Sequence, residues 1–295
     1  MTSTTVVRNL VSAVQRLFPK ALADSAWDNT GLLLDVPPLL QSISKARVLL
    51  TIDLTTAVAD EAISSNAVLI VSYHPIIFRP LKALSVTNSQ QRTLIRLAQA
   101  GISVYCPHTA VDAQNGGMND WLVKVALGTS FDNSSAVQSK VIEPSPASTD
   151  IPNTGFGRLV SLPSEPNEIF LPQIVDNVKS GLNLDHVQVA VAVKHRSEPV
   201  RKIALCAGSG SSVLAKAPDA DLWFTGELSH HEILALLERN VSAIICGHTN
   251  TERGYLKSTF APMLASEILR SPADFSEVDV EVIVSTQDTD PLTLF

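Results

Sequence analysis

The most constraining feature of the chain is an apolar run that stops on a histidine. Residues Val68 to Pro75 read VLIVSYHP, so four aliphatic residues lead towards His74 and a proline follows at once. A short apolar run bounded by a breaker is typical of a buried strand, which places His74 where the strand leaves its sheet. The pattern occurs again in GISVYCPH, ending on His108, and in VSAIICGH, ending on His248. We therefore predict three buried strands that each lead to a histidine.

The order of the apolar patterns predicts an α/β fold. Residues 47–54 (RVLLTIDL) form another strand pattern, and helical spacing follows over residues 55–64, where Thr55 is suited to be the N-cap, and over residues 89–100. Alternating strands and helices imply right-handed crossovers and mixed, mainly parallel sheets. Apolar residues make up 45% of the chain and aromatic residues only 5%. Such aliphatic strands are typical of sheets covered by helices on both faces.

A change of composition in the middle of the chain indicates two lobes. Residues 128–166 are rich in Ser, Pro, Asn, Asp and Thr and show little periodicity, as irregular connectors do. We predict a first lobe over about 1–127 and a second over about 167–295. Further strands are expected over 155–160, 187–193, 202–207, 222–225 and, as an alternating edge strand, 278–283; further helices are expected over 5–18, 119–126, 171–180, 229–238 and 251–269, the last kinked by Pro262.

Charge and cysteine usage restrict the class of protein. The formal net charge is −7 and no block of Lys or Arg occurs, which argues against direct nucleic-acid binding and against a membrane-surface protein. No apolar window is long enough for a transmembrane helix. Cys106, Cys206 and Cys246 lie in apolar runs without CxxC spacing, so we expect buried free thiols and a cytoplasmic protein. A mitochondrial pool stays open, because Arg8 and Arg16 lie in an acid-poor, Ser/Thr-containing opening. A nuclear pool stays open as well.

The strand-end histidines predict a metal site. The carboxyl ends of parallel strands meet at one edge of a sheet, and a carboxylate follows four residues after two of the histidines, namely Asp112 after His108 and Glu252 after His248. Imidazole nitrogens and carboxylate oxygens are ligands of first-row metals. Two alternatives stay open: a strand-end histidine that is only hydrogen-bonded, and a Glu252 that closes a capping box begun by Thr249. Recurrence at three of the 7 histidines favours the metal site.

Three other features have both a functional and a plain structural interpretation. Ser229 and Glu232 match a capping box, and His230 and His231 between them lie on a predicted first helical turn, where they are proton relays or surface residues. The loop 208–210 (GSG) follows a strand and is a phosphate contact or, as we favour, a tight turn, since the lysine of a P-loop is missing. The turn-rich segment 24–31 is a loop or lines the site. No pattern predicts a nucleophilic residue.

Taken together, the motifs resemble those of the NIF-three-like family, whose bacterial members include YbgI and which is often described as GTP cyclohydrolase I type 2 homologs. The motifs are DSAWDNTGL at 24–32, YHP at 73–75 with Phe78, YCPHTAVD at 105–112, CAGSG at 206–210, TGE at 225–227 with His230 and His231, and GH at 247–248 with Glu252. They occur in this order across nearly the whole chain, and their combination is specific. Their wording is most similar to the fungal members, which are named for interaction with a transcriptional coactivator component.

The resemblance implies a two-lobed α/β fold, a di-metal centre between the lobes and ring-shaped homo-oligomers, commonly hexamers. It implies as metal ligands His74, Asp112, His248 and Glu252. Supporting roles, as proton relays, further ligands or ligand contacts, are expected for His108, Tyr73, His230, His231, Asp28, Asn29, Ser209 and Glu227. Bacterial relatives usually have two adjacent histidines where this chain has Tyr73 and His74. The second of two ions is therefore expected to bind more weakly or through the Tyr73 phenol.

Two functions fit this site. The first is a metal-dependent hydrolase of a nucleotide-like or other small substrate, in which one or two Zn, Mn, Fe or Ni ions activate a water. The second is a non-enzymatic metal-binding scaffold that acts through protein partners such as a transcriptional coregulator. A catalytic site keeps an exchangeable water position, whereas a structural site is closed by protein ligands. The sequence alone does not separate the two.

Overall fold

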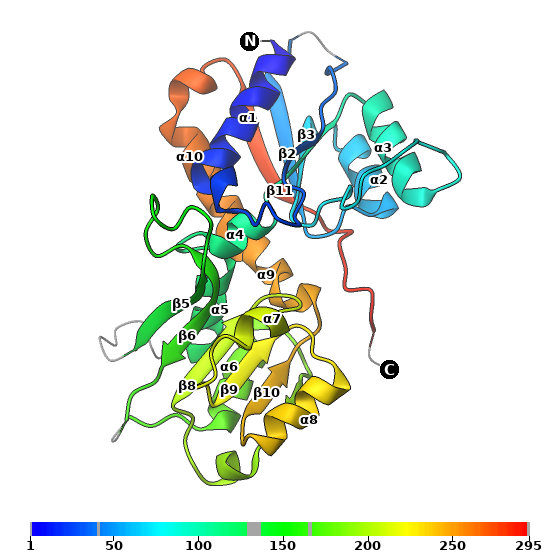
Figure 1. The fold of residues 1–295 in the computed structure, drawn as a ribbon. Coiled ribbons are helices and arrows are strands. Elements are labelled where there is room, and N and C mark those ends of the chain that lie inside the picture. The colour runs from blue at the N-terminus through cyan, green and yellow to red at the C-terminus, as the bar shows by residue number, and fades with distance from the viewer. Residues whose placement is uncertain (1, 40–41, 129–136, 165–166, 294–295) are drawn as a thin grey trace. The chain divides into compact units, whose positions relative to one another are not determined.

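The computed structural model describes residues 2–39, 42–128, 137–164 and 167–293 (Figure 1). The chain divides into two compact units, of which unit one comprises residues 1–111 and 255–295 and unit two comprises residues 112–254. Each contains a sheet flanked by helices, so the predicted α/β class with mixed sheets is confirmed.

Unit one is built on a five-stranded sheet in the order β1-β4-β3-β2-β11. Its strands are β1 (Gly31–Leu34), β2 (Lys45–Thr51), β3 (Leu69–Ser72), β4 (Ser103–Cys106) and β11 (Asp279–Val284). The strands β4, β3, β2 and β11 are parallel to one another, whereas β1 is antiparallel to β4. The parallel arrangement follows from the predicted strand-helix-strand order and brings the carboxyl ends of β2, β3 and β4 to one edge.

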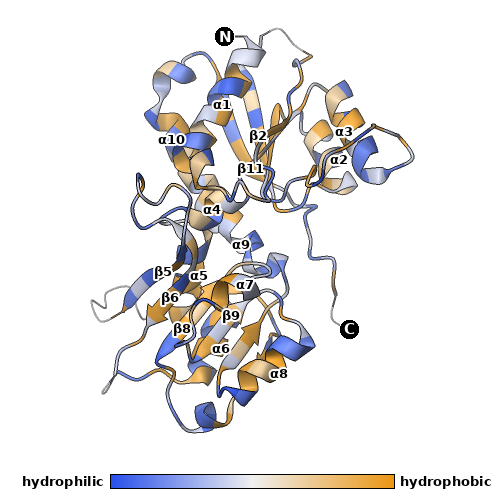
Figure 2. Cartoon of the chain, viewed as in Figure 1, coloured by the Kyte–Doolittle hydropathy of each residue, from blue (hydrophilic) through white to orange (hydrophobic). Residues whose placement is uncertain are grey.

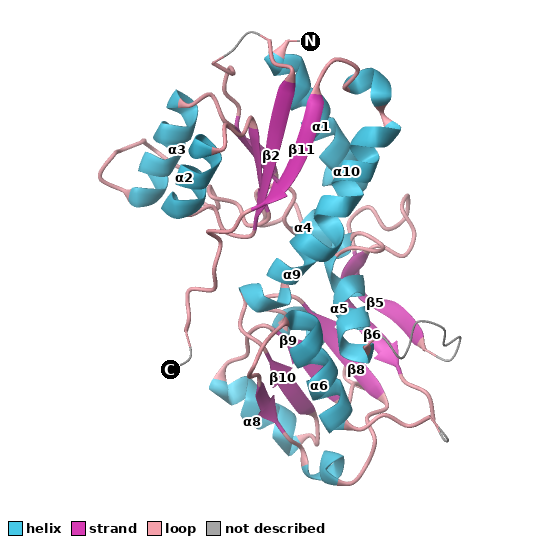
Figure 3. Cartoon of the chain, turned by 180° about the vertical axis from the view of Figure 1, so that it is seen from behind, coloured by secondary structure: helices cyan, strands magenta, loops and turns pink. Residues whose placement is uncertain are grey.

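Helices cover both faces of this sheet. They are α1 (Ser3–Leu17), α2 (Thr56–Ser64), α3 (Ser89–Gln99), α4 (Thr109–Ala113) and α10 (Ala261–Arg270), with 3-10 helices η1 (Lys20–Leu22) and η6 (Pro272–Asp274). Figures 1 and 3 show α1 and α10 on one face and α2 and α3 on the other. The second face is closed by aliphatic packing that includes Val58, Leu94 and Leu97, all at most 2% exposed. Thr55 caps α2 by accepting a hydrogen bond from the Val58 amide, as predicted.

Unit two holds a six-stranded sheet in the order β5-β6-β8-β9-β10-β7. Its strands are β5 (Gln138–Pro144), β6 (Gly155–Ser161), β7 (Gln188–Ala190), β8 (Lys202–Cys206), β9 (Leu222–Thr225) and β10 (Ser242–Ile245); its helices are α5 (Met118–Leu127), α6 (Leu171–Leu182), α7 (Ser211–Leu214), α8 (His230–Glu238) and the 3-10 helices η3 (Val193–Arg196) and η4 (Thr249–Thr251). The central strands β8, β9 and β10 are parallel. Figure 2 shows β8 and β9 as mainly hydrophobic, in keeping with helices on both faces.

Two features of the unit boundaries differ from the sequence prediction. In the segment 128–166, predicted as irregular apart from a strand over 155–160, the described part contains that strand as β6 and a further strand, β5, antiparallel to it. Strand β5 is an edge strand with no fully buried residue, so it lacks the apolar periodicity that identifies other strands. Residues 255–295, assigned to the second lobe by the predicted division, belong to unit one. The reason is long-range pairing, because β11 lies beside β2 (Figure 3) and no local pattern encodes that partner.

The helix predicted over 251–269 is divided into several segments. A short helix α9 (Arg253–Tyr255) leads into a π-helical turn η5 (Leu256–Phe260), and α10 follows. Pro262 lies in the first turn of α10. Since proline has no amide hydrogen, the regular ladder is interrupted around it, and the π turn takes up the change in register.

The cysteines and the helix lengths agree with the composition. Cys106, Cys206 and Cys246 are free and buried. Across the described residues, no helix has both the length and the hydropathy that crossing a bilayer requires.

Candidate metal centre

In unit one, His74 lies just after the end of β3. The chain turns out of β3 after Ser72, and the His74 amide donates to the Ile52 carbonyl at 3.0 Å, so His74 lies beside the end of β2. Asp53 follows β2, and its Oδ1 lies 3.0 Å from His74 Nδ1. A carboxylate can only accept, so Nδ1 carries the hydrogen and Nε2 keeps its lone pair. No role was predicted for Asp53 from the sequence. Its position just after the strand next to β3 was the one feature that could have indicated it.

His108 has the same arrangement at the end of β4. Its Nδ1 lies 2.6 Å from Asp28 Oδ1, and its backbone adopts a left-handed φ of 32°. Such a conformation costs a non-glycine residue about 1 kcal/mol or more and persists where surrounding contacts require it. The Thr109 hydroxyl donates to the other oxygen of Asp28. Asp28 therefore holds the ring and the backbone of this turn together, a more specific role than the ligand contact predicted for it.

Electrostatics keep Asp28 ionised. Burial by itself would raise the pKa of Asp28, but the hydrogen bond and positive charge available from His108, together with hydrogen bonds from Thr109 and the Asn29 amide, lower the pKa below its ordinary value. The carboxylate form is the one that can accept from His108 Nδ1. When His108 is neutral, this hydrogen bond selects the tautomer whose lone pair is on Nε2.

In unit two, His248 and Glu252 lie together after β10. His248 Nδ1 lies 3.1 Å from Glu227 Oε2, and His248 Nε2 lies 3.4 Å from Glu252 Oε1. Glu252 is only 1% exposed, whereas Glu227 lies at the surface. Thr249 begins η4, and its hydroxyl accepts a hydrogen bond from the Arg253 side chain. Glu252 is thus a buried carboxylate next to the imidazole of His248.

Gly208 packs directly against the side chains of His248 and Glu252, and we call the loop around it the floor of this site. A Cβ on Gly208 would lie 2.7 Å from Glu252 Oε1 and 2.8 Å from His248 Nε2, and Gly208 has a φ of +59°. The Gly208 carbonyl accepts from the Gly226 and Glu227 amides, and its amide donates to the Thr251 hydroxyl. These bonds tie together the loops that follow β8, β9 and β10. They also use the amide that a phosphate contact in this loop would need, so the tight-turn interpretation is favoured.

A buried asparagine connects this floor to the segment that carries Asp112. Asn119 is 0% exposed; its side-chain amide donates to the Asp112 carbonyl at 3.1 Å, and its Oδ1 accepts from the Ala207 amide at 3.1 Å. Burial, followed by the negative charges of Asp112 and Glu252, raises the pKa of the Cys206 thiol far above its ordinary value. The negative charges of Asp112 and Glu252 thus both act on the Cys206 thiol. Asn119 was not predicted as a site residue, because its sequence position carries no signal beyond that of a helix.

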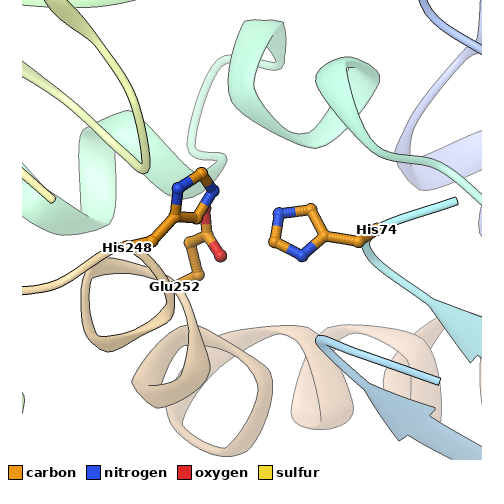
Figure 4. A group of neighbouring side chains, drawn as sticks. All are labelled: His74, His248 and Glu252. Carbon is orange, nitrogen blue, oxygen red and sulfur yellow. The ribbon is translucent and has the colours of Figure 1, made fainter. Parts of the chain in front are cut away.

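Three of the predicted ligands form a group that could hold a metal ion. His74, His248 and Glu252 each offer one ligand atom, and these atoms lie within 4.8 Å of one another (Figure 4). Ligands about 2.0 to 2.2 Å from a common ion are separated by distances of this order. Asp112, the fourth predicted ligand, is not one of this group. Two imidazoles and a carboxylate without a thiolate suit Zn, Mn, Fe or Ni.

The other predicted residues occupy varied positions. Tyr73 is 3% exposed, and its ring centroid lies 5.0 Å from that of His74 and 5.4 Å from that of His108. His230 and His231 are exposed on the first turn of α8, behind the predicted capping box of Ser229 and Glu232, which is confirmed. Within the described part of the chain, neither histidine belongs to the metal group. Asn29 donates to the Ile77 carbonyl, and Ser209 is exposed.

We expect the carboxylates behind the histidines to control metal affinity. The substitutions Asp53→Asn and Glu227→Gln each keep the size of the side chain but remove its charge, and we expect each to lower metal affinity by about 10- to 100-fold. Competition against a chromophoric chelator measures this directly. Asp60→Asn is the matched control, because Asp60 is a surface carboxylate with 56% of its side chain exposed. Wild-type affinity in both variants would show that these carboxylates do not orient metal ligands.

Comparison with known proteins places the chain among related sequences and folds. Residues 5–291 match the family model described as Duf34/NIF3 (NGG1p interacting factor 3). The chain is 45% identical to the protein NIF3 homolog of Schizosaccharomyces pombe, over 99% of both chains. It is 43% identical to NGG1-interacting factor 3 of Saccharomyces cerevisiae, over 97% of this chain and 96% of the relative. A solved Bacillus cereus protein related to NIF3 has a similar fold, with a TM-score of 0.75 at 21% identity over 98% of both chains.

Proposed function

Because the chain belongs to the Duf34/NIF3 family, we propose that it is a metal-dependent hydrolase of a nucleotide-like or other small substrate. The proposed metal ligands are His74, His248 and Glu252, with Asp112 as a fourth. One or two divalent ions are compatible with this set of donors, and Tyr73 is the proposed further ligand if a second ion binds.

One observation carries the proposal: each strand-end histidine has a carboxylate on its Nδ1. The pairs are His74 with Asp53 at 3.0 Å, His108 with Asp28 at 2.6 Å, and His248 with Glu227 at 3.1 Å. Metal-binding histidines typically donate their second nitrogen to a carboxylate, which sets the tautomer and raises the basicity of the coordinating nitrogen. A histidine with only a structural role does not require this arrangement at three separate strand ends.

In the proposed hydrolysis, the metal ligands and His108 have different roles. A bound divalent ion would supply Lewis acidity and lower the pKa of a bound water. His108 is the proposed proton carrier, because Nε2 is free to accept a proton while Asp28 on Nδ1 stabilises the resulting imidazolium. The rings of His108 and His74 are 5.5 Å apart between centroids, so the carrier lies beside a proposed ligand.

Hydrolysis that depends on added metal tests this function. Chelator-treated protein is reloaded separately with Zn, Mn, Fe or Ni and assayed against a panel of nucleoside phosphates. We expect activity to return with metal and to fall by at least about a hundredfold in His74→Ala, as is typical when a catalytic group is removed. His186→Ala is the control, since His186 is exposed. Activity that survives chelation and is equal in wild type and His74→Ala would refute the proposal.

A second candidate is a scaffold whose metal has a structural role. The observation that favours it is the name of the Saccharomyces cerevisiae relative, NGG1-interacting factor 3, which describes partner binding by that protein. Under this alternative the chain retains metal, acts on no member of the panel and binds a transcriptional coregulator. Homo-oligomers, expected as hexamers, are compatible with both candidates, and light scattering coupled to gel filtration measures their mass. The cytoplasmic location stays a prediction from the free thiols.

A further inference from the structure

Two aromatic side chains of unit one are held at the surface next to His108. Trp27 is 54% exposed and Phe78 is 46% exposed. Their ring centroids are 6.1 Å apart and the rings are inclined by 57°, while the centroid of Trp27 lies 5.9 Å from that of His108 at an angle of 89°. We call Trp27 and Phe78 the aromatic corner.

Hydrogen bonds hold the aromatic corner in place. The Trp27 indole nitrogen donates to Asp24 Oδ2 at 2.8 Å, and the Asp24 amide donates to the Thr109 hydroxyl at 3.1 Å. On the other side, the Asn29 side chain donates to the Ile77 carbonyl and so ties the loop of Trp27 to the loop of Phe78. The Trp27 ring is therefore held in an exposed position and the backbone next to Phe78 is tied to the same loop, so a ligand would lose little conformational entropy in ordering them.

The exposure of these rings is unusual within this chain. Among the described residues, the exposed aromatic side chains are Trp27, Phe78 and Phe170, and two of the three lie together beside His108. Exposed aromatic area is unfavourable in water. Such rings, when rigid and next to reactive side chains, are suited to covering a ligand, because a planar ring can stack on the face of one and meet the other at an angle.

We propose that the aromatic corner binds a planar heteroaromatic ring of the substrate, an assignment that rests on the proposed hydrolase function of the neighbouring histidines. A ring stacked on Trp27 would bring its substituents next to His108, the proposed proton carrier. The inclination of 57° defines a corner rather than a parallel slot. The aromatic corner therefore fits a single flat ring, one edge of which stays uncovered and can carry a polar group.

Binding of two matched probes tests the aromatic corner. Adenosine 5′-monophosphate and ribose 5-phosphate share a sugar and a phosphate and differ in the ring, and their dissociation constants are measured by calorimetry on the full-length, metal-loaded protein. We expect the wild type to prefer the ring-bearing probe by about tenfold to a hundredfold, the range for one stacked base. Trp27→Ala should abolish this preference and leave the affinity for ribose 5-phosphate unchanged.

Two controls separate stacking from general damage. Trp27→Phe retains a ring and should keep most of the preference, and Phe170→Ala removes the exposed aromatic at the start of α6 and should keep all of it. Equal affinities of the two probes in wild type, or a preference that Trp27→Ala leaves intact, would overturn the proposal. Metal content and hydrolysis are measured on the same samples. In the wild type, metal-dependent activity without a ring preference refutes the corner alone, whereas a ring preference without hydrolysis refutes the hydrolase alone.

Discussion

Substitution of His248 or Glu252 by alanine is expected to leave the purified protein nearly free of metal after gel filtration. In proteins, even the carboxylates that orient metal-bound histidines are worth about 10- to 100-fold in affinity. Loss of a ligand itself should therefore lower metal affinity by more than about a hundredfold. Metal content is measured by elemental mass spectrometry, and affinity by competition with a chelator.

Conservative variants make this prediction robust against misfolding. Glu252 is 1% exposed, so Glu252→Ala removes buried side-chain volume. Glu252→Gln keeps the shape of the side chain and removes only the negative charge of the proposed metal ligand. We expect Glu252→Gln to lose metal with an unchanged unfolding transition. His186→Ala should retain wild-type metal content, because His186 is an exposed histidine away from the group. Unchanged metal content in His248→Ala and Glu252→Gln would refute the metal site.

The substitution Gly208→Ala is expected to abolish metal binding without touching a ligand. The added Cβ would lie 2.7 Å from Glu252 Oε1 and 2.8 Å from His248 Nε2, closer than side-chain carbons approach other atoms. Both ligand atoms would have to move, and the backbone of Gly208 cannot yield because its amide and carbonyl are hydrogen-bonded to neighbouring loops. We expect a loss of metal affinity comparable to that of a ligand substitution, together with about 1–2 kcal/mol of lost unfolding free energy from the left-handed conformation.

Gly116→Ala isolates the steric effect from the backbone effect. Gly116 has a φ of +76°, similar to the +59° of Gly208, but a Cβ on Gly116 would meet no atom within 4 Å. We expect Gly116→Ala to lose a comparable amount of unfolding free energy in chemical denaturation while its metal affinity stays at the wild-type value. If Gly208→Ala also binds metal like wild type, the close approach of Gly208 to the ligands has no functional importance.

Local patterns were sufficient to identify much of the fold. The three strands that lead to histidines are confirmed as β3, β4 and β10. The N-cap at Thr55 and the capping box at Ser229 are confirmed as well. These features depend on residues close together in the chain, where burial and capping set the pattern directly. The polar edge strand β5 has no such pattern and was therefore missed.

The supporting residues of the site could not be found in this way. Asp53 contacts His74 because β2 lies next to β3 in the sheet, and Asn119 connects residues that are far apart in the chain. A carboxylate or amide at a loop start looks the same in sequence whether it faces solvent or a histidine. The role of Gly208 was likewise hidden, since a glycine in a loop indicates a turn but not which side chains approach it.

By itself, the sequence determined the α/β class, the family, and the strand-end histidines with their carboxylates, because burial and hydrogen-bonding capacity leave periodic traces along the chain. Only the tertiary structure decided which carboxylate holds which imidazole, which glycine makes room for Glu252, and that β11 joins the sheet of unit one. The physical reason is that sheet order and loop packing pair residues across long stretches of chain. Such pairings depend on the whole fold and leave no periodic mark on the residues themselves.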